Sequence, residues 1–306
     1  MAVIAIDCGG SKLAVGVARG GPGTMPEEVA RARTPDVAAE IPVAMIDLVA
    51  PLMEPGVEAI GIGVAGLVDH LGGSLLWMPH ASGSMIPIAD LVADRFGVPV
   101  AIDNDANLAT LAEATLGAGT GHRMVLMVAL GTGIGGSLVI DGSIEHGRAH
   151  LGEIGHMVLD PDGPECPCGG KGCWEALVSG TALDKASARI VADEPSGPLA
   201  VVADGAPLGH HLAPAAVAGD AAAEKALHDA GWWLARGLAN LLVALDPDVV
   251  VIGGWGAGTE LVSIATDQID GLIEGSGHRK PTPIVPARFG PAAGLIGAAE
   301  LARSLT

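Results

Sequence analysis

Short apolar runs that end in glycine or in polar residues recur along the 306-residue chain. Their length and their β-branched residues are typical of buried strands, which we predict at residues 3–7, 13–18, 57–66, 98–103, 124–130, 137–142 and 248–254. Apolar positions at helical spacing predict helices within residues 36–53, 87–97, 108–117, 180–192, 219–245 and 291–305. Residues 194–214 are rich in Pro, Gly and Ala, which favours a surface connection. Together these elements indicate an α/β protein.

Glycine-rich turns join two pairs of the predicted strands. The first turn follows Asp7 and contains Gly9, Gly10, Ser11 and Lys12. The second repeats the design of a strand, a turn with a hydroxyl residue and a strand, and contains Gly131, Thr132 and Gly133. It does not open a helix, so it lacks the context of the dinucleotide-binding fingerprint. Each turn can simply reverse the chain, but two of the same kind suggest duplicated lobes that hold a phosphate chain through backbone N–H groups. A carboxylate at the position of Asp7 can hold Mg²⁺ beside phosphate.

Polar residues gather where the strand at 98–103 ends. The group consists of Asp103, Asn104, Asp105 and Asn107, ahead of the helix at 108–117. Open α/β sheets bind ligands at the carboxyl ends of their strands, so this group is a candidate site. Capping of the helix by one Asp or Asn would explain only one of the four. A second candidate is the glycine run at 253–258, where Gly253 and Gly254 would let a flat ligand approach the backbone.

Three of the four cysteines stand close together, ten positions or more after a histidine. His156, Cys166, Cys168 and Cys173 form the pattern His-x9-Cys-x-Cys-x4-Cys. One imidazole and three thiolates are the ligands of a tetrahedral structural zinc site. A closed site of four ligands leaves no position for a reactive water, so we expect a scaffold and not a catalyst. The alternatives are buried free cysteines, or a disulfide that would leave one cysteine unpaired.

Two glutamates flank the cysteine loop. Glu153 precedes His156 by three residues and Glu175 follows Cys173 by two. A zinc ion would therefore fix two carboxylates near one point, and paired carboxylates suit polyhydroxylated ligands. Either Glu alone could be an ordinary solvated surface charge.

Composition narrows the classes of partner. The chain has 16 basic and 35 acidic residues, a net charge of −19, no Tyr and two Phe. Such a surface repels nucleic acid and anionic membranes and offers few aromatic platforms for single strands. No apolar run reaches the length of a membrane span without Gly, Pro or a charge, and the N-terminus lacks a signal-peptide pattern. Cysteines that serve as metal ligands favour a reducing cytoplasm.

These motifs resemble those of the ROK family (repressors, open reading frames and sugar kinases), most closely its bacterial glucokinase-like members. The resemblance covers nearly the whole chain and rests on residues 7–12, 103–107, 131–136, 153–156 and 166–175. It implies the actin/hexokinase ATPase fold, in which two ribonuclease-H-like lobes enclose a cleft. We expect a small lobe of residues 1–118, completed by the C-terminal helix 291–306. The remaining residues, 119–290, would form a large lobe with a zinc-binding loop at 156–173.

The resemblance also implies an activity, the transfer of a phosphoryl group from ATP·Mg²⁺ to a sugar hydroxyl, usually O6 of a hexose. By the matching positions, Asp105 would be the general base. Contacts to the sugar or to its zinc scaffold would come from Asn104, Glu153, His156 and Glu175. The ATP phosphates would be held by Gly9, Gly10, Ser11, Lys12, Gly131, Thr132 and Gly133. Asp7 would lie near Mg²⁺, and Gly253 and Gly254 would lie under adenosine.

His80 departs from the family pattern. Glucokinase-like members usually carry Asn after the Pro that matches Pro79, followed by a Gly-Trp pair whose Trp is replaced here by Ser84. An imidazole and a smaller neighbour would accept a sugar altered at C2 or C3. Such sugars include an aminoglucose like kanosamine, and N-acylhexosamines such as N-acetylglucosamine and N-acetylmannosamine. The alternative is a harmless exchange of one hydrogen-bonding group for another.

A sugar-sensing regulator is the alternative from another class, because part of the family regulates transcription. Those members carry a helix-turn-helix segment ahead of the kinase-like body, and this chain has no room for one before Asp7. Its acidic charge also opposes DNA binding. Family members are commonly dimers or tetramers, so we expect a homo-oligomer.

Overall fold

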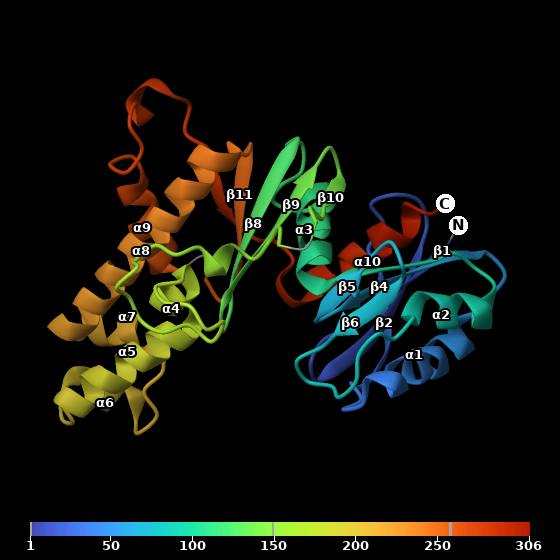
Figure 1. Cartoon of the computed structure of the whole chain (residues 1–306), viewed down its shortest axis with the longest axis horizontal. Helices are drawn as coiled ribbons and strands as arrows, with labels where there is room; N and C mark the ends of the chain where they lie inside the picture. The colour runs from blue at the N-terminus through green and yellow to red at the C-terminus, as the bar shows by residue number, and fades with distance from the viewer. Residues whose placement is uncertain (1, 149, 257–258) are drawn as a thin grey trace. The chain divides into compact units, whose positions relative to one another are not determined.

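The structure of the protein is a computed structural model that describes residues 2–148, 150–256 and 259–306. The chain divides into unit 1 (residues 1–123, 139–144 and 288–306) and unit 2 (residues 124–138 and 145–287). Two five-stranded sheets with flanking helices confirm the predicted α/β class with two sheet-containing lobes (Figure 1). Among the described residues, no helix has both the length and the hydropathy that a membrane crossing requires.

The sheet of unit 1 has the strand order β3-β2-β1-β4-β7. Its strands are β1 (Ala2–Cys8), β2 (Lys12–Arg19), β3 (Glu27–Arg33), β4 (Val57–Val64) and β7 (Val100–Asn104). β1 pairs antiparallel with β2 and parallel with β4, and β4 pairs parallel with β7. The apolar pattern predicts all of these except the edge strand β3, whose sequence is mostly polar and exposed. A small hairpin of β5 (Leu67–Asp69) and β6 (Ser74–Trp77) follows β4.

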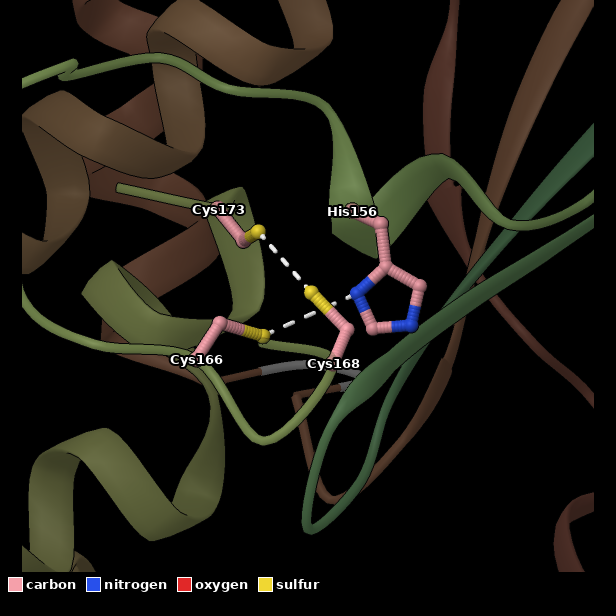
Figure 2. Close-up of side chains that lie close together, drawn as sticks. All are labelled: His156, Cys166, Cys168 and Cys173. Atoms are coloured by element: carbon pink, nitrogen blue, oxygen red, sulfur yellow. Dashed lines mark hydrogen bonds between the residues drawn. The ribbon is translucent and has the colours of Figure 1, made fainter. Parts of the chain in front are cut away.

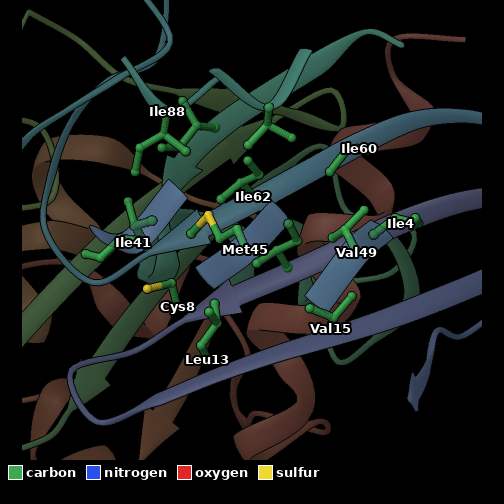
Figure 3. Packing of buried hydrophobic residues seen from close by; sticks show 14 of the residues in the cluster. Ile4, Cys8, Leu13, Val15, Ile41, Met45, Val49, Ile60, Ile62 and Ile88 are labelled. Atoms are coloured by element: carbon green, nitrogen blue, oxygen red, sulfur yellow. The ribbon is translucent and has the colours of Figure 1, made fainter. Parts of the chain in front are cut away.

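Side chains of β1 alternate between two hydrophobic clusters, one on each face of this sheet. Ile4 and Ile6 belong to one cluster, whereas Val3 and Ala5 belong to the other. The first cluster is completed by α1 (Ile41–Val49) and α2 (Ile88–Phe96), which supply buried Ile, Met and Val side chains (Figure 3). The second is completed by α3 (Asp105–Leu116) and α10 (Ala293–Arg303). Burial on both faces makes β1 and β4 the rigid centre of unit 1.

Small residues bring α10 close to its neighbours. A Cβ atom at Gly297 would overlap the carbonyl group of Leu108 in α3, and one at Gly294 would lie 2.9 Å from Oδ1 of Asp7. Gly297 therefore allows α10 to pack closely against α3, and Gly294 allows α10 to support the end of β1 that carries Asp7.

The second five-stranded sheet has the order β10-β9-β8-β11-β12. Its strands are β8 (Met124–Leu130), β9 (Ile134–Ile140), β10 (Ser143–Glu145), β11 (Val249–Gly254) and β12 (Ile284–Pro286). The helices of unit 2 are α4 (Trp174–Val178), α5 (Gly180–Asp193), α6 (Pro198–Ala203), α7 (Leu212–Val217), α8 (Ala221–Leu245) and α9 (Glu260–Ile269). The prediction of a surface connection at 194–214 is wrong, because α6 and the start of α7 lie there. Leu199 and Leu212 anchor these two short helices in the core.

Glu113 is a fully buried carboxylate of α3 that gathers backbone N–H groups. It accepts hydrogen bonds from Ala118 at 2.9 Å and from Arg288 and Phe289 at 2.8 Å. Ala118 precedes β8, and Arg288 and Phe289 follow β12. Within unit 1, one side chain therefore holds the segment that leads into the second sheet together with the segment that returns from it.

Candidate functional site

The turn between β1 and β2 places Asp7 at the end of a central strand. The turn is closed by a hydrogen bond of 2.9 Å from the N–H of Gly9 to the carbonyl of Lys12. Asp7 is half-buried, and burial followed by the negative charge of Asp105 raises the pKa of Asp7 to about 6. Two carboxylates predicted from separate motifs are thus close enough in unit 1 to influence each other.

The junction of β7 and α3 holds the second carboxylate. Asn104 caps α3, because its side chain accepts the N–H groups of Ala106 and Asn107, and it also donates to the carbonyl of Gly66 at 3.0 Å. Asp105 is the first residue of the helix, which begins three residues earlier than the pattern predicts. Burial raises the pKa of Asp105, opposed by the hydrogen bond from the N–H of Ala106. A carboxylate with a raised pKa is better matched to accepting a proton near neutral pH.

His80 lies against the glycine turn. A Cβ atom at Gly10 would overlap the imidazole of His80. The ring therefore occupies space that only a glycine leaves free, directly beside the turn predicted to hold phosphates. Lys12, another residue of that turn, pairs with Glu28 at 3.3 Å, and Ser11 is exposed.

The predicted metal ligands converge in unit 2. His156, Cys166, Cys168 and Cys173 point toward one another (Figure 2), and their ligand atoms all lie within 4.8 Å of one another. Sγ of Cys166 is 3.7 Å from Nδ1 of His156, and Sγ of Cys168 is 3.6 Å from Sγ of Cys173. Tetrahedral zinc with ordinary bond lengths separates its ligand atoms by about 3.5 Å. All four cysteines of the chain are free thiols, so the group fits a structural zinc ion.

Local backbone geometry closes the cysteine loop. The N–H of Trp174, just after Cys173, donates to the carbonyl of Met157 at 2.8 Å, next to His156. Gly172 has a φ of +65°, and a Cβ atom there would overlap the carbonyl of Asp160. This position therefore requires glycine on two grounds, its dihedral angle and its lack of a side chain.

Glu153 and Glu175 each lie near one of the two nitrogens of the His156 ring. Oε2 of Glu153 is 3.7 Å from Nε2, and Oε1 of Glu175 is 3.7 Å from Nδ1. A metal bound at Nδ1 would leave the proton on Nε2, the nitrogen that faces Glu153, and metal-ligating histidines usually direct this second nitrogen toward a carboxylate. Glu175 also reaches the second glycine turn, because its Oε2 accepts the N–H of Ile134 at 3.3 Å. The cysteine loop, both glutamates and this turn therefore form one connected group.

The carbonyl groups of the second glycine turn bind the start of α5. Gly131 accepts the N–H of Gly180 at 3.0 Å, and Thr132 accepts that of Thr181 at 3.2 Å. The indole N–H of Trp255 also donates to the carbonyl of Gly131, at 2.8 Å. Three segments far apart in the sequence therefore meet at one residue of the turn.

A cavity of about 470 Å³ opens beside this turn in unit 2. It is lined by Gly131, Thr132, Gly180, Thr181, Leu183, Asp184, Leu208, Gly209, His210, Ala213, Leu227, Trp255, Thr259, Glu260 and Leu261. Gly253 and Gly254 end β11 just before Trp255. Ala257 and Gly258 of the same glycine run lie outside the described residues. The sequence did not point to Asp184 as part of this lining, and it pointed to Trp255 only as an aromatic residue within the glycine run.

The similarity to known proteins extends over nearly the whole chain. The profile of the ROK family matches residues 3–304. A glucokinase of Streptomyces coelicolor is 34% identical over 316 aligned residues, which cover 98% of this chain and 97% of that protein. The crystal structure of a ROK family glucokinase from Streptomyces griseus, in complex with glucose and AMPPNP, is 35% identical. It superposes with a TM-score of 0.79 and covers 99% of this chain and 100% of that one. An N-acetylmannosamine kinase of Escherichia coli is 32% identical, with 99% of both chains covered.

Proposed function

Because this chain belongs to the ROK family, we propose that it is an ATP-dependent kinase that phosphorylates the 6-hydroxyl group of a hexose. The observation that carries the proposal is its similarity, from end to end, to a glucokinase that binds glucose and an ATP analogue. Asp7 and Asp105 of unit 1 support the proposal, because phosphoryl transfer to a hydroxyl group needs a carboxylate that accepts a proton and a ligand near Mg²⁺.

Asp105 is proposed as the general base. A primary hydroxyl group is a poor nucleophile, so a carboxylate must accept its proton as the oxygen attacks phosphorus. The bond from O6 to the γ-phosphorus forms while the bond from that phosphorus to the bridging oxygen breaks. ADP then leaves and the proton stays on Asp105. The raised pKa of Asp105, caused by burial, supports this role.

Apart from proton transfer, catalysis of phosphoryl transfer consists mainly of positioning the two substrates and neutralising the charge of the phosphates. The turns Gly9 to Lys12 and Gly131 to Gly133 are proposed to hold the ATP phosphates. Asp7 would lie near Mg²⁺, which neutralises phosphate charge when it is bound. The cavity beside Gly131 would take the adenosine part, close to Gly253 and Gly254.

Glu153, Glu175, His156 and Asn104 are proposed to bind sugar hydroxyl groups or to support the groups that do. His156, Cys166, Cys168 and Cys173 would hold zinc, which contributes folding energy and keeps the loop in shape. The distances of Glu153 and Glu175 from the His156 ring support a link between the metal site and sugar binding.

The finer proposal concerns the sugar, which would be glucose or an aminoglucose such as kanosamine. His80 supports an altered sugar, because its imidazole can accept or donate one hydrogen bond where an asparagine amide is usual. Its contact with Gly10 places that imidazole beside the phosphate turn. The second candidate is an N-acylhexosamine, favoured by the similarity to N-acetylmannosamine kinase. We also propose a cytoplasmic homo-oligomer, a dimer or a tetramer, by analogy with the family.

A panel of sugars assayed for ADP release tests the proposal. It should include glucose, 2-amino- and 3-aminoglucose, mannose, N-acetylglucosamine and N-acetylmannosamine, with NMR of the product to locate the phosphate. We expect turnover with glucose or an aminoglucose, and phosphate on O6. In His80→Asn, kcat/KM for glucose should rise relative to that for the aminoglucose. No ADP release above background with any hexose would overturn the proposed activity.

A further inference from the structure

Among the Trp, Tyr and Phe side chains that the structure describes, Trp255 alone lines the cavity of about 470 Å³ beside the second glycine turn. We propose that this indole is the platform on which the purine base of the nucleotide stacks, an assignment that rests on the ATP-dependent activity proposed above. Trp255 would thus be a binding residue supplied by this chain within its glycine run.

Two hydrogen bonds fix Trp255 before any ligand arrives. Its backbone N–H donates to the carbonyl of Leu130 at 3.0 Å, and its indole N–H donates to the carbonyl of Gly131 at 2.8 Å. Both acceptors lie at the end of β8, where the strand enters the glycine turn. Because both the backbone and the indole of Trp255 are held, the side chain has little rotamer freedom left to lose. Stacking of a ligand on it therefore carries a small entropic cost.

The free surface of Trp255 is its carbon surface. The residue is 40% exposed although its one polar side-chain atom is already bonded within the protein. An indole donates only through that N–H, so no further hydrogen bond accounts for the exposure. A flat aromatic ligand would cover this surface and gain the stacking energy of an aromatic pair.

The charges of the cavity favour the base and ribose of a nucleotide over its phosphates. Its described lining contains Asp184 and Glu260 but neither Lys nor Arg, and several of its walls are leucines. Oδ1 of Asp184 is held by the N–H of Gly209 at 2.6 Å. Carboxylates accept hydrogen bonds from ribose hydroxyl groups but repel phosphate, and aliphatic walls suit a base.

The position of Trp255 also gives the direction of the ligand. Its indole N–H binds Gly131, the first residue of the turn proposed to hold phosphates. A base on the indole therefore leads its ribose and phosphates toward Gly131–Gly133. The same hydrogen bond suggests the competing account, in which Trp255 only braces the turn.

Binding of two partial ligands to the whole protein separates these accounts. Adenosine carries the base without phosphates, and inorganic tripolyphosphate carries phosphates without a base. We expect Trp255→Ala to raise the Kd of adenosine about 10-fold and to leave that of tripolyphosphate unchanged, by calorimetry. Trp255→Phe keeps a ring but lacks the N–H, and should stay within about 3-fold of the wild type. Trp77→Ala removes an indole that is 50% exposed on β6, outside the cavity, and should change neither Kd.

Other changes in the two dissociation constants would overturn the platform. Equal weakening of both ligands in Trp255→Ala would mean that the residue only braces the turn. An unchanged adenosine Kd, or a wild type that binds no adenosine, would mean that no base stacks there. Adenosine binding that depends on Trp255 in a protein that phosphorylates no hexose would instead overturn the proposed kinase activity and leave the platform standing.

Discussion

The indole N–H of Trp174 donates a hydrogen bond of 2.9 Å to the carbonyl of Trp233, in the middle of α8. Trp174 directly follows Cys173 and is fully buried. The cysteine loop is therefore anchored to the longest helix of unit 2 by the residue next to one of its metal ligands.

Gly237→Ala tests how tightly this anchor is packed. Alanine normally stabilises a helix by about 1 kcal/mol relative to glycine, but a Cβ atom at Gly237 would overlap the Trp174 ring. Overpacking typically costs about 1–3 kcal/mol, so we expect a lower free energy of unfolding in a urea titration. Asn240→Ala, at an exposed position of the same helix, is the control and should change stability little. An unchanged or raised stability of Gly237→Ala would mean that Trp174 is not packed as described.

Zinc should copurify with the protein at one ion per chain. Cys168→Ala should lose the ion and lower the melting temperature, because structural zinc contributes folding energy. Elemental analysis and thermal unfolding measure both. Cys8 is the matched control, since burial raises the pKa of its thiol to about 12 and keeps it protonated. Cys8→Ala should therefore retain its zinc, whereas full stability of Cys168→Ala without metal would contradict the scaffold role.

Asp7→Asn should be more stable than the wild type at neutral pH in buffer without Mg²⁺. The folded pKa of Asp7, about 6, lies above its value in the unfolded chain, so the folded state binds the proton more tightly. The wild type therefore loses stability as pH rises from about 4 to about 6, by up to ~3 kcal/mol. The variant cannot ionise, so its advantage should vanish below about pH 4. The exposed Asp94→Asn should show no such pH-dependent difference, and a stability gap for Asp7→Asn that is equal at pH 4 and pH 7 would refute the assignment.

Glu113→Gln should destabilise unit 1 while keeping the shape of the side chain. The carboxylate accepts three backbone N–H groups, whereas an amide offers one oxygen and directs an NH₂ group at the remaining donor. Unsatisfied buried groups cost about 1–3 kcal/mol each, which chemical denaturation can resolve. Glu58→Gln, at an exposed position of β4, provides the reference. Equal stability of the two variants would show that Glu113 does not hold these segments.

Local sequence patterns predicted those parts of the fold and the site whose interacting residues lie near one another in the sequence. The zinc-fitting group was predictable because His156 and the three cysteines lie within 18 residues and their spacing is itself the signal. The buried strands of both sheets were predictable because apolar runs report burial directly. The polar edge strand β3 was not, since tertiary pairing with β2 determines it.

Contacts between distant segments escaped prediction. The bond from Trp255 to Gly131 joins residues 124 positions apart, and Glu113 meets Phe289 across 176 positions. A contact between such distant residues produces no hydrophobic periodicity or local motif by which a single sequence could reveal it. The helices within 194–214 were missed for another reason, because Pro198 stands at the first position of α6, where proline is tolerated.

The turnover number of Asp105→Asn tests the central claim most directly. The change keeps the size of the side chain and the start of α3 but removes the group proposed to accept the hydroxyl proton. With the best hexose of the panel and saturating ATP·Mg²⁺, we expect kcat to fall by at least ~100-fold at an unchanged melting temperature. Asp94→Asn should keep the wild-type rate. Turnover of Asp105→Asn close to that of the wild type would contradict the assignment of Asp105 as the base.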